Sequence, residues 1–144
     1  MTTTEPATAS TAKTLRIDFV SDVVCPWCAI GLKSLQRALH ELDGEVAADL
    51  HVQPFELNPQ MPAEGENAIE HLVYKYRTTP EQLEVSSANI VARGAALGFT
   101  FGASRDRRIY NTFDAHRLLH WAELEGRQLE LKEKIGRASC RERV

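Results

Sequence analysis

Residues 15–28 have the sequence LRIDFVSDVVCPWC, and this stretch decides the fold. Its first half alternates apolar and charged residues and then ends in an apolar run, which is typical of a strand in a buried sheet. Directly after Cys25, leucines recur at helical spacing as far as an Asp-Gly stop at residues 43–44. Residues 48–55 alternate again. The sequence therefore predicts a strand, a crossover helix and a second strand, a βαβ unit with Cys25 at the turn from strand to helix.

Three helices are predicted after the βαβ unit, beyond a Pro- and Gly-containing loop at residues 56–65. The first begins at Asn67. The second begins at residues 79–82, TPEQ, which supply an N-cap, a first-turn proline and a glutamine in the capping-box position, and it ends at Gly98. The third covers residues 111–126 and places alanines and leucines on one face.

The composition indicates one globular domain at most. The 144 residues are 43% hydrophobic and 26% charged, and the net charge of −3 provides no basic field for a nucleic acid. No apolar run approaches the roughly 20 residues that cross a bilayer, so we expect no membrane partner. Residues 1–14 are rich in Thr and Ala and lack the order of a secretory signal, so we predict a disordered tail on a cytoplasmic protein.

The Cys-Pro-Trp-Cys motif predicts thiol–disulfide exchange. A free thiol is mostly protonated at neutral pH, but the N-terminus of a helix, where the pattern places Cys25, favours the thiolate. Pro26 fits this position because a proline lacks the N–H that would have no partner there. Cys28 lies within reach of Cys25, so we predict that Cys25 attacks and Cys28 resolves, through a redox-active disulfide. Trp27 is predicted to point outward and contact substrate.

A zinc site is the competing interpretation, because Cys-x2-Cys is followed by His116-x3-His120. A zinc finger has about a dozen residues between its two halves, whereas whole predicted helices separate them here. The two histidines also lack the glutamate of a zinc protease motif. We therefore expect no metal. For His116 we expect a hydrogen bond within the helical layer, with a place in a substrate groove as the alternative.

Four separated motifs together resemble one known family. They are residues 20–28, 30–31, 54–59 and 111–117, and in this order they are similar to the DsbA-family oxidoreductases of the FrnE type. The resemblance covers about residues 15–134. It implies an α/β, thioredoxin-like fold carrying an inserted all-helical domain, a cytoplasmic setting, and disulfide oxidoreductase or isomerase activity on a thiol- or disulfide-containing protein or small molecule.

The resemblance also implies a domain division, and two alternative functions stay open. The N-terminal βαβ part of the thioredoxin-like domain is predicted at residues 15–66, and an incomplete helical insertion domain at 67–134. Related kappa-class glutathione transferases and 2-hydroxychromene-2-carboxylate isomerases typically replace the first cysteine by serine. Both cysteines are present here, so a glutathione-dependent isomerase or transferase, with glutathione as co-substrate, is the first alternative. A non-catalytic metal-binding or scaffold domain is the second.

The C-terminal segment departs from the family pattern. Family members continue into a cis-proline loop, two strands and a helix, and we expect this ββα half to be missing. Residues 135–144, IGRASCRERV, equal the translation of one frame of a common sequencing-adapter string, so we predict a non-native, adapter-derived tail and assign no chemistry to Cys140. Such a chain would leave its first strand as an unpaired edge, and we expect it to be marginally stable or weakly active.

Overall fold

The computed structural model describes residues 13–102 and 106–140. Residues 1–12 of the predicted disordered tail lie outside this range, as do the last four residues of the predicted adapter-derived tail. The first strand begins at Lys13, so the final two residues of the predicted tail belong to regular structure. No helix in the described residues is long and apolar enough to cross a membrane.

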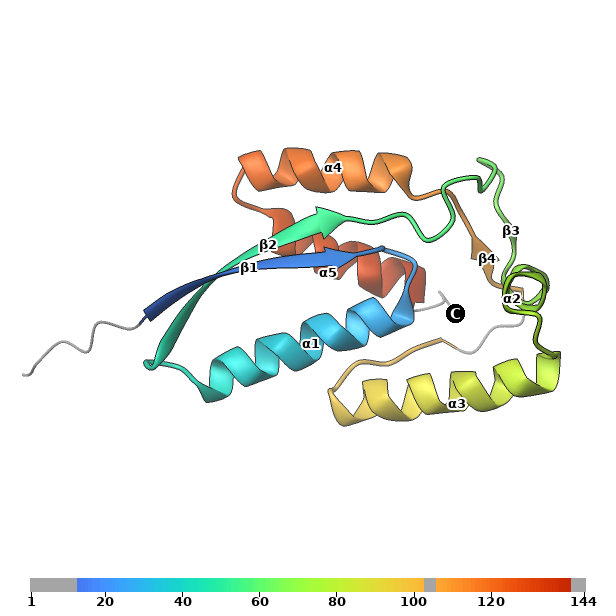
Figure 1. Cartoon of the computed structure of the whole chain (residues 1–144), viewed down its shortest axis with the longest axis horizontal. Helices are drawn as coiled ribbons and strands as arrows, with labels where there is room; N and C mark the ends of the chain where they lie inside the picture. Colours follow the sequence, from blue (N-terminus) through green and yellow to red (C-terminus); the bar gives the residue numbers. More distant parts are fainter. Residues whose placement is uncertain (1–12, 103–105, 141–144) are drawn as a thin grey trace, which may run out of the picture.

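The predicted βαβ unit is confirmed. Strand β1 (Lys13–Ser21) leads into helix α1 (Pro26–Glu41), and strand β2 (Val46–Pro54) then pairs parallel to β1. The pairing runs in register from Lys13 opposite Val46 to Ser21 opposite Pro54. Gly44, in the predicted stop, has a φ of +83°, which glycine adopts without strain. The two strands end side by side, so the segments that follow them start at the same edge of the sheet (Figure 1).

Helices α2 (Ala68–Tyr76) and α3 (Pro80–Ala96) begin where their capping residues predict. The side chain of Asn67 accepts hydrogen bonds from two first-turn N–H groups of α2. Thr79 and Gln82 form the predicted capping box of α3. Both helices therefore start through contacts between residues at most three positions apart, which the sequence alone reveals.

Two short strands, β3 (Glu66–Asn67) and β4 (Arg108–Ile109), pair antiparallel and were not predicted. Two residues are too few to show an alternating pattern. Gly65 makes this pairing possible: its φ is +68°, and a Cβ atom there would lie 2.4 Å from the carbonyl oxygen of Ile109. The pairing joins the segment after β2 to the segment before the next helix.

The prediction of three helices after the βαβ unit is wrong by one, because α4 (Phe113–Leu124) is followed by α5 (Gln128–Cys140). Two of the buried positions of α5 are polar, Gln128 and Lys132, so the helix shows no clear apolar stripe. Helix α5 includes the first six residues of the segment predicted as adapter-derived. The adapter origin of that segment stays a prediction.

Three helices pack against the β1–β2 pair. Helix α1 lies along one face of the pair, while α4 and α5 pack together and contact β2, and α5 also contacts α1 (Figure 1). The side-chain amide of Gln128 donates to the carbonyl oxygen of Val52 at 3.0 Å and accepts from its N–H at 2.8 Å, as a neighbouring strand would. The predicted insertion, residues 67–134, thus contains helices with different surroundings: α2 and α3 contact each other, whereas α4 and α5 contact the sheet. The domain boundaries stay a prediction.

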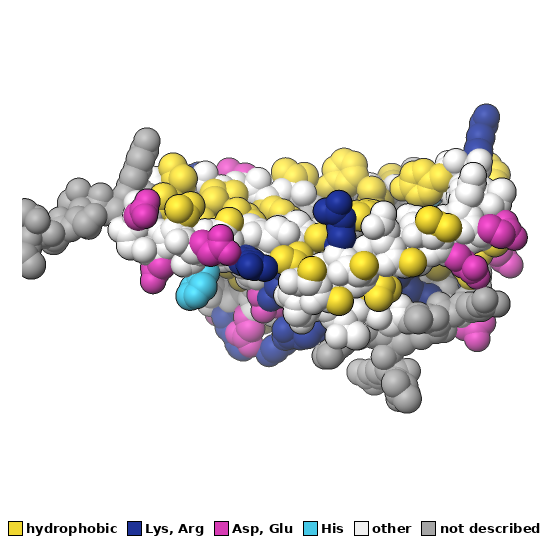
Figure 2. All heavy atoms as spheres, turned by 90° about the horizontal axis from the view of Figure 1, so that it is seen from below, with side chains coloured by type: hydrophobic (Ala, Val, Ile, Leu, Met, Phe, Trp, Pro, Cys, Tyr) yellow, Lys and Arg dark blue, Asp and Glu magenta, His cyan; other side chains and the backbone are white. Residues whose placement is uncertain are grey.

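The core is divided into small clusters. Ile30 of α1 packs with Phe99 and Phe101, and the ring of Phe101 lies so close to α3 that only glycine fits at position 94. A second cluster, around Met61, joins the loop after β2 to α2 and β4. Apolar side chains are also spread over the surface that α1 and α3 present (Figure 2).

Candidate active site

Cys25 is the N-cap residue of α1, as the sequence predicts. Its backbone is extended, with φ −85° and ψ 113°, and its carbonyl oxygen accepts the first helical hydrogen bonds from the N–H groups of Cys28 at 3.1 Å and Ala29 at 3.2 Å. Its side chain makes no capping hydrogen bond, and Pro26 occupies the first turn. The sulfur therefore sits at the positive end of the helix dipole.

The two thiols share a proton. Both cysteines are half-buried, and a hydrogen bond between their side chains raises the pKa of Cys25 and lowers the pKa of Cys28 to about 6. Because the two ionisations are coupled, they belong to the pair and not to either residue alone. The hydrogen bond between the sulfurs therefore favours a pair in which one sulfur is a thiolate and the other keeps its proton. Attack by Cys25 in particular stays a prediction.

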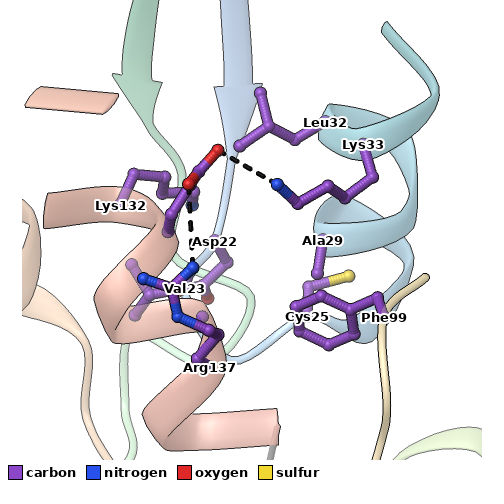
Figure 3. Close-up of a pocket in the computed structure, with 11 residues that line it drawn as sticks. Asp22, Val23, Cys25, Ala29, Leu32, Lys33, Phe99, Lys132 and Arg137 are labelled. Atoms are coloured by element: carbon purple, nitrogen blue, oxygen red, sulfur yellow. Dashed lines mark hydrogen bonds and ion pairs between the residues drawn. The ribbon is translucent and has the colours of Figure 1, made fainter. Parts of the chain in front are cut away.

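A small cavity of about 20 Å³, large enough for one water molecule, lies beside Cys25. Figure 3 shows Cys25 next to Phe99 on one side of this cavity and Lys132, from α5, on the other. Lys132 is only 4% exposed. After the hydrogen bond from Cys25, burial raises the pKa of Cys28, a hydrogen bond from the backbone N–H of Asp22 and the charge of Lys132 lower it, and the charge of Asp22 raises it slightly. Sequence reasoning missed Lys132, because it missed α5.

Trp27 lies at the surface beside the two cysteines. Its side chain is 46% exposed, and the guanidinium carbon of Arg93, from α3, lies 6.0 Å from the centre of its indole ring. A cation at this distance over an aromatic face is attracted to the ring. The exposed ring is available to a substrate, and its contact with substrate stays a prediction.

Asp22 is buried just before the cysteines, and sequence reasoning overlooked it. Its carboxylate accepts hydrogen bonds from the N–H groups of Val23 and Leu57, each at 2.7 Å, and lies 3.3 Å from Nε2 of His116. Burial raises its pKa, but these hydrogen bonds outweigh burial and the net pKa is lowered. The sequence contains one hint, an acidic residue directly after β1 and followed by two valines.

The sequence and structure match known proteins of one kind. The family model for the DSBA-like thioredoxin domain matches residues 16–143. The chain belongs to this family. A crystal structure of a probable DsbA oxidoreductase from Streptomyces coelicolor is 32% identical, with a TM-score of 0.81, and the match covers 90% of this chain. It covers 56% of that chain, so the present chain spans little more than half of that protein's length. No curated protein matches the chain significantly.

In this DSBA-like domain, the side chain of His116 is buried and that of His120 is exposed. Nε2 of His116 lies 3.1 Å from the carbonyl oxygen of Phe55 as well as facing Asp22, so the ring takes part in a buried polar contact. His116 also borders a cavity of about 190 Å³ between β2 and α4, whose lining includes neither cysteine. His120 is 74% exposed at its side chain. Among the described residues, no cluster of three or more His, Cys, Asp or Glu side chains is arranged to hold a metal ion.

Proposed function

We propose that the chain carries the dithiol centre of a thiol–disulfide oxidoreductase, acting on thiol- or disulfide-containing proteins or small molecules. The observation that carries this proposal is the Cys-Pro-Trp-Cys motif at the N-terminus of α1 in a DSBA-like thioredoxin domain. The probable oxidoreductase from Streptomyces coelicolor supports the same class of reaction. The FrnE type is proposed on the four sequence motifs alone.

The exchange proceeds in two balanced steps. The thiolate of Cys25 attacks one sulfur of a substrate disulfide, forming a mixed disulfide and releasing the other substrate sulfur as a thiolate that takes up a proton. Cys28 then loses its proton and attacks the sulfur of Cys25, which breaks the mixed disulfide and releases the remaining substrate sulfur as a thiolate that takes up a proton. The products are the Cys25–Cys28 disulfide and a substrate dithiol, so two electrons have moved to the substrate. The reverse sequence oxidises a substrate dithiol.

The shared proton reconciles attack by Cys25 with the lowered pKa of Cys28. The hydrogen bond between the sulfurs connects them directly, so the proton can pass from Cys25 to Cys28 as a substrate disulfide approaches. Cys25 is favoured as the attacking residue because its sulfur lies at the end of the helix and borders the cavity beside α5. Cys28 lies one turn further along the helix.

Trapping of the mixed disulfide tests this assignment. The Cys28→Ser variant, which cannot resolve, is expected to accumulate a covalent adduct with a disulfide substrate such as oxidised glutathione, visible by mass spectrometry under non-reducing conditions. The matched Cys25→Ser variant is expected to accumulate none. Adduct formation by Cys25→Ser alone would exchange the two roles, and absence of adducts in both variants would contradict the proposed function.

A further inference from the structure

An arginine of α3 lies over the exposed tryptophan that separates the two cysteines. The guanidinium carbon of Arg93 is 6.0 Å from the centre of the Trp27 indole ring, and both side chains are exposed. A guanidinium is planar, so one that stacks on a ring still has N–H groups along its edge that can donate to a carboxylate, two at a time. Arg93 can therefore bind an anion while it remains over Trp27.

Contacts within the fold hold Arg93 near Cys25. The carbonyl oxygen of the next residue, Gly94, accepts a hydrogen bond from the N–H of Phe99 at 2.8 Å. Phe99 in turn lines the small cavity beside Cys25 (Figure 3). The backbone at Gly94 also packs so closely against Phe101 that a Cβ atom there would lie 2.4 Å from its ring. The backbone that carries Arg93 is thus fixed at the edge of the cysteine site.

The positive charges near Cys25 differ in their partners. Lys33 and Arg137 line the cavity beside Cys25, and each forms an ion pair with Glu133, at 3.1 Å and 3.7 Å. In the part of the chain that the structure describes, Arg93 contacts the indole ring and forms no ion pair with a carboxylate. The chain as a whole has a net charge of −3, which repels an acidic substrate. The charge of Arg93 can offset that repulsion at the site itself.

Apolar side chains accompany Arg93 on this surface. Trp27 of α1 and Val91 of α3 are 46% and 41% exposed, and Figure 2 shows apolar side chains spread over the surface of these two helices. A peptide can cover apolar side chains here and place a carboxylate on Arg93, whereas an inorganic anion can use the charge alone. The combination of positive charge and apolar surface favours an acidic peptide segment as the occupant.

We propose that Arg93 and Trp27 form a binding site for a carboxylate that lies close to the reacting cysteine of a peptide or protein substrate. The carboxylate belongs to an acidic residue next to that cysteine, because an extended chain advances only about 3.5 Å per residue and Arg93 lies beside the ring of Trp27. Arg93 is thus a specificity-determining residue, and the exchange itself stays with Cys25 and Cys28. This inference rests on the proposed function and names the class of substrate that it serves.

The experiment measures how fast the Cys28→Ser variant forms a mixed disulfide with two matched probes. The probes are the symmetrical disulfides of N-acetyl-Cys-Asp-amide and N-acetyl-Cys-Asn-amide, which differ only in having a carboxylate or an amide next to the cysteine. Each rate, followed by mass spectrometry, is divided by the rate with 2-mercaptoethanol to remove intrinsic reactivity. Adding Arg93→Met is expected to slow the Asp probe about fivefold or more at low salt, and the Asn probe less than about twofold, because only the guanidinium is lost.

Two further substitutions in the same Cys28→Ser background are controls. Arg93→Lys keeps the charge but lacks the planar fork, so the Asp probe is expected to react at an intermediate rate. Arg37 pairs with Glu41 at 3.0 Å and lies 12 residues after Cys25, about 18 Å further along α1. Arg37→Met changes the net charge by the same amount and is expected to leave both rates within about twofold. Added salt is expected to bring the rate of the Asp probe closer to that of the Asn probe.

Failure of the proposed function and failure of the carboxylate site give different results. If neither Cys28→Ser nor Cys25→Ser forms an adduct with either probe, the proposed function fails and the carboxylate site fails with it. If the probes react but Arg93→Met slows both equally, or neither, only the carboxylate site is overturned. Should Arg93→Met not fold, the Cys28→Ser variant alone decides: an Asp probe that reacts no faster than the Asn probe at low salt overturns the site.

Discussion

Two histidine–carboxylate pairs tie α4 to the rest of the fold, one to the loop after β1 and the other to β2, and they differ in burial. The side chains of Asp22 and His116 are 1% and 6% exposed, and their closest atoms lie 3.3 Å apart. His51 and Glu123 are closer, at 2.7 Å, but their side chains are 23% and 30% exposed. Water screens the second pair and cannot replace the contacts of the first. We therefore expect the buried pair, Asp22 and His116, to contribute more to the free energy of unfolding than the closer but more exposed pair, His51 and Glu123.

The two histidines also differ in their partners. Nδ1 of His51 faces Glu123, and Nε2 lies 3.1 Å from a carboxylate oxygen of Asp49, so the ring satisfies both neighbours only as an imidazolium. Accordingly, the pKa of His51 is raised, first by the hydrogen bond with Glu123 and then by that with Asp49. His116 instead shares one N–H between a carboxylate and a carbonyl oxygen. The site at His51 is therefore expected to respond to pH.

Among the variants that test this contrast, Asp22→Ala is expected to change the free energy of unfolding the most. The substitution leaves the N–H groups of Val23 and Leu57 without their buried acceptor and removes one of the two acceptors of the His116 ring, so we expect a loss of about 3 kcal/mol or more in the free energy of unfolding. Asp49→Ala, which removes the exposed partner of His51, is expected to change it by about 0.5 kcal/mol or less. Urea unfolding of both variants measures the difference, and comparable losses would contradict the role given to burial.

A smaller effect, on the pKa of the reduced cysteine pair, is expected when one of the two lysines that line the cavity beside Cys25 is replaced. Lys132 is buried, whereas Lys33 is more exposed and forms an ion pair with Glu133 at 3.1 Å. Lys132→Met removes a buried positive charge that favours the thiolate, so the pKa of the reduced pair is expected to rise, whereas Lys33→Met is expected to leave it nearly unchanged. Thiolate absorbance against pH measures both. A larger shift in Lys33→Met would show that Lys132 does not act on the cysteines.

The smallest effect is expected for the contribution of His51 to the free energy of unfolding, and this contribution depends on pH. Its folded-state pKa is raised above the unfolded value of about 6.5, so the stability that it contributes is fully present below that value. That contribution is lost as the pH rises through the folded pKa. His51→Gln is therefore expected to unfold more easily than the unsubstituted chain in mildly acidic urea, with the difference shrinking in mildly alkaline urea. A difference that does not depend on pH would mean that His51 is not charged in the folded state.

Local patterns explain the parts of the structure that the sequence predicted. The alternation that ends at Cys25 predicted β1, and residues within three positions of Thr79 predicted the start of α3. Helix α5 was missed because its buried face carries Gln128 and Lys132, whose places depend on β2 and on the cysteine site. No local pattern contains that information, because the partner of each of these side chains lies in another element.

The sequence by itself determined that two cysteines stand at the N-terminus of a helix after a parallel strand, because strand alternation, helical spacing and a first-turn proline are all local. Only the tertiary structure decided what surrounds them. Parallel pairing ends β1 and β2 at the same edge, which brings Asp22 to Leu57, and the packing of α4 on β2 brings His116 to the same carboxylate. Burial of that carboxylate requires all its donors at once, and those donors come from segments far apart in the chain.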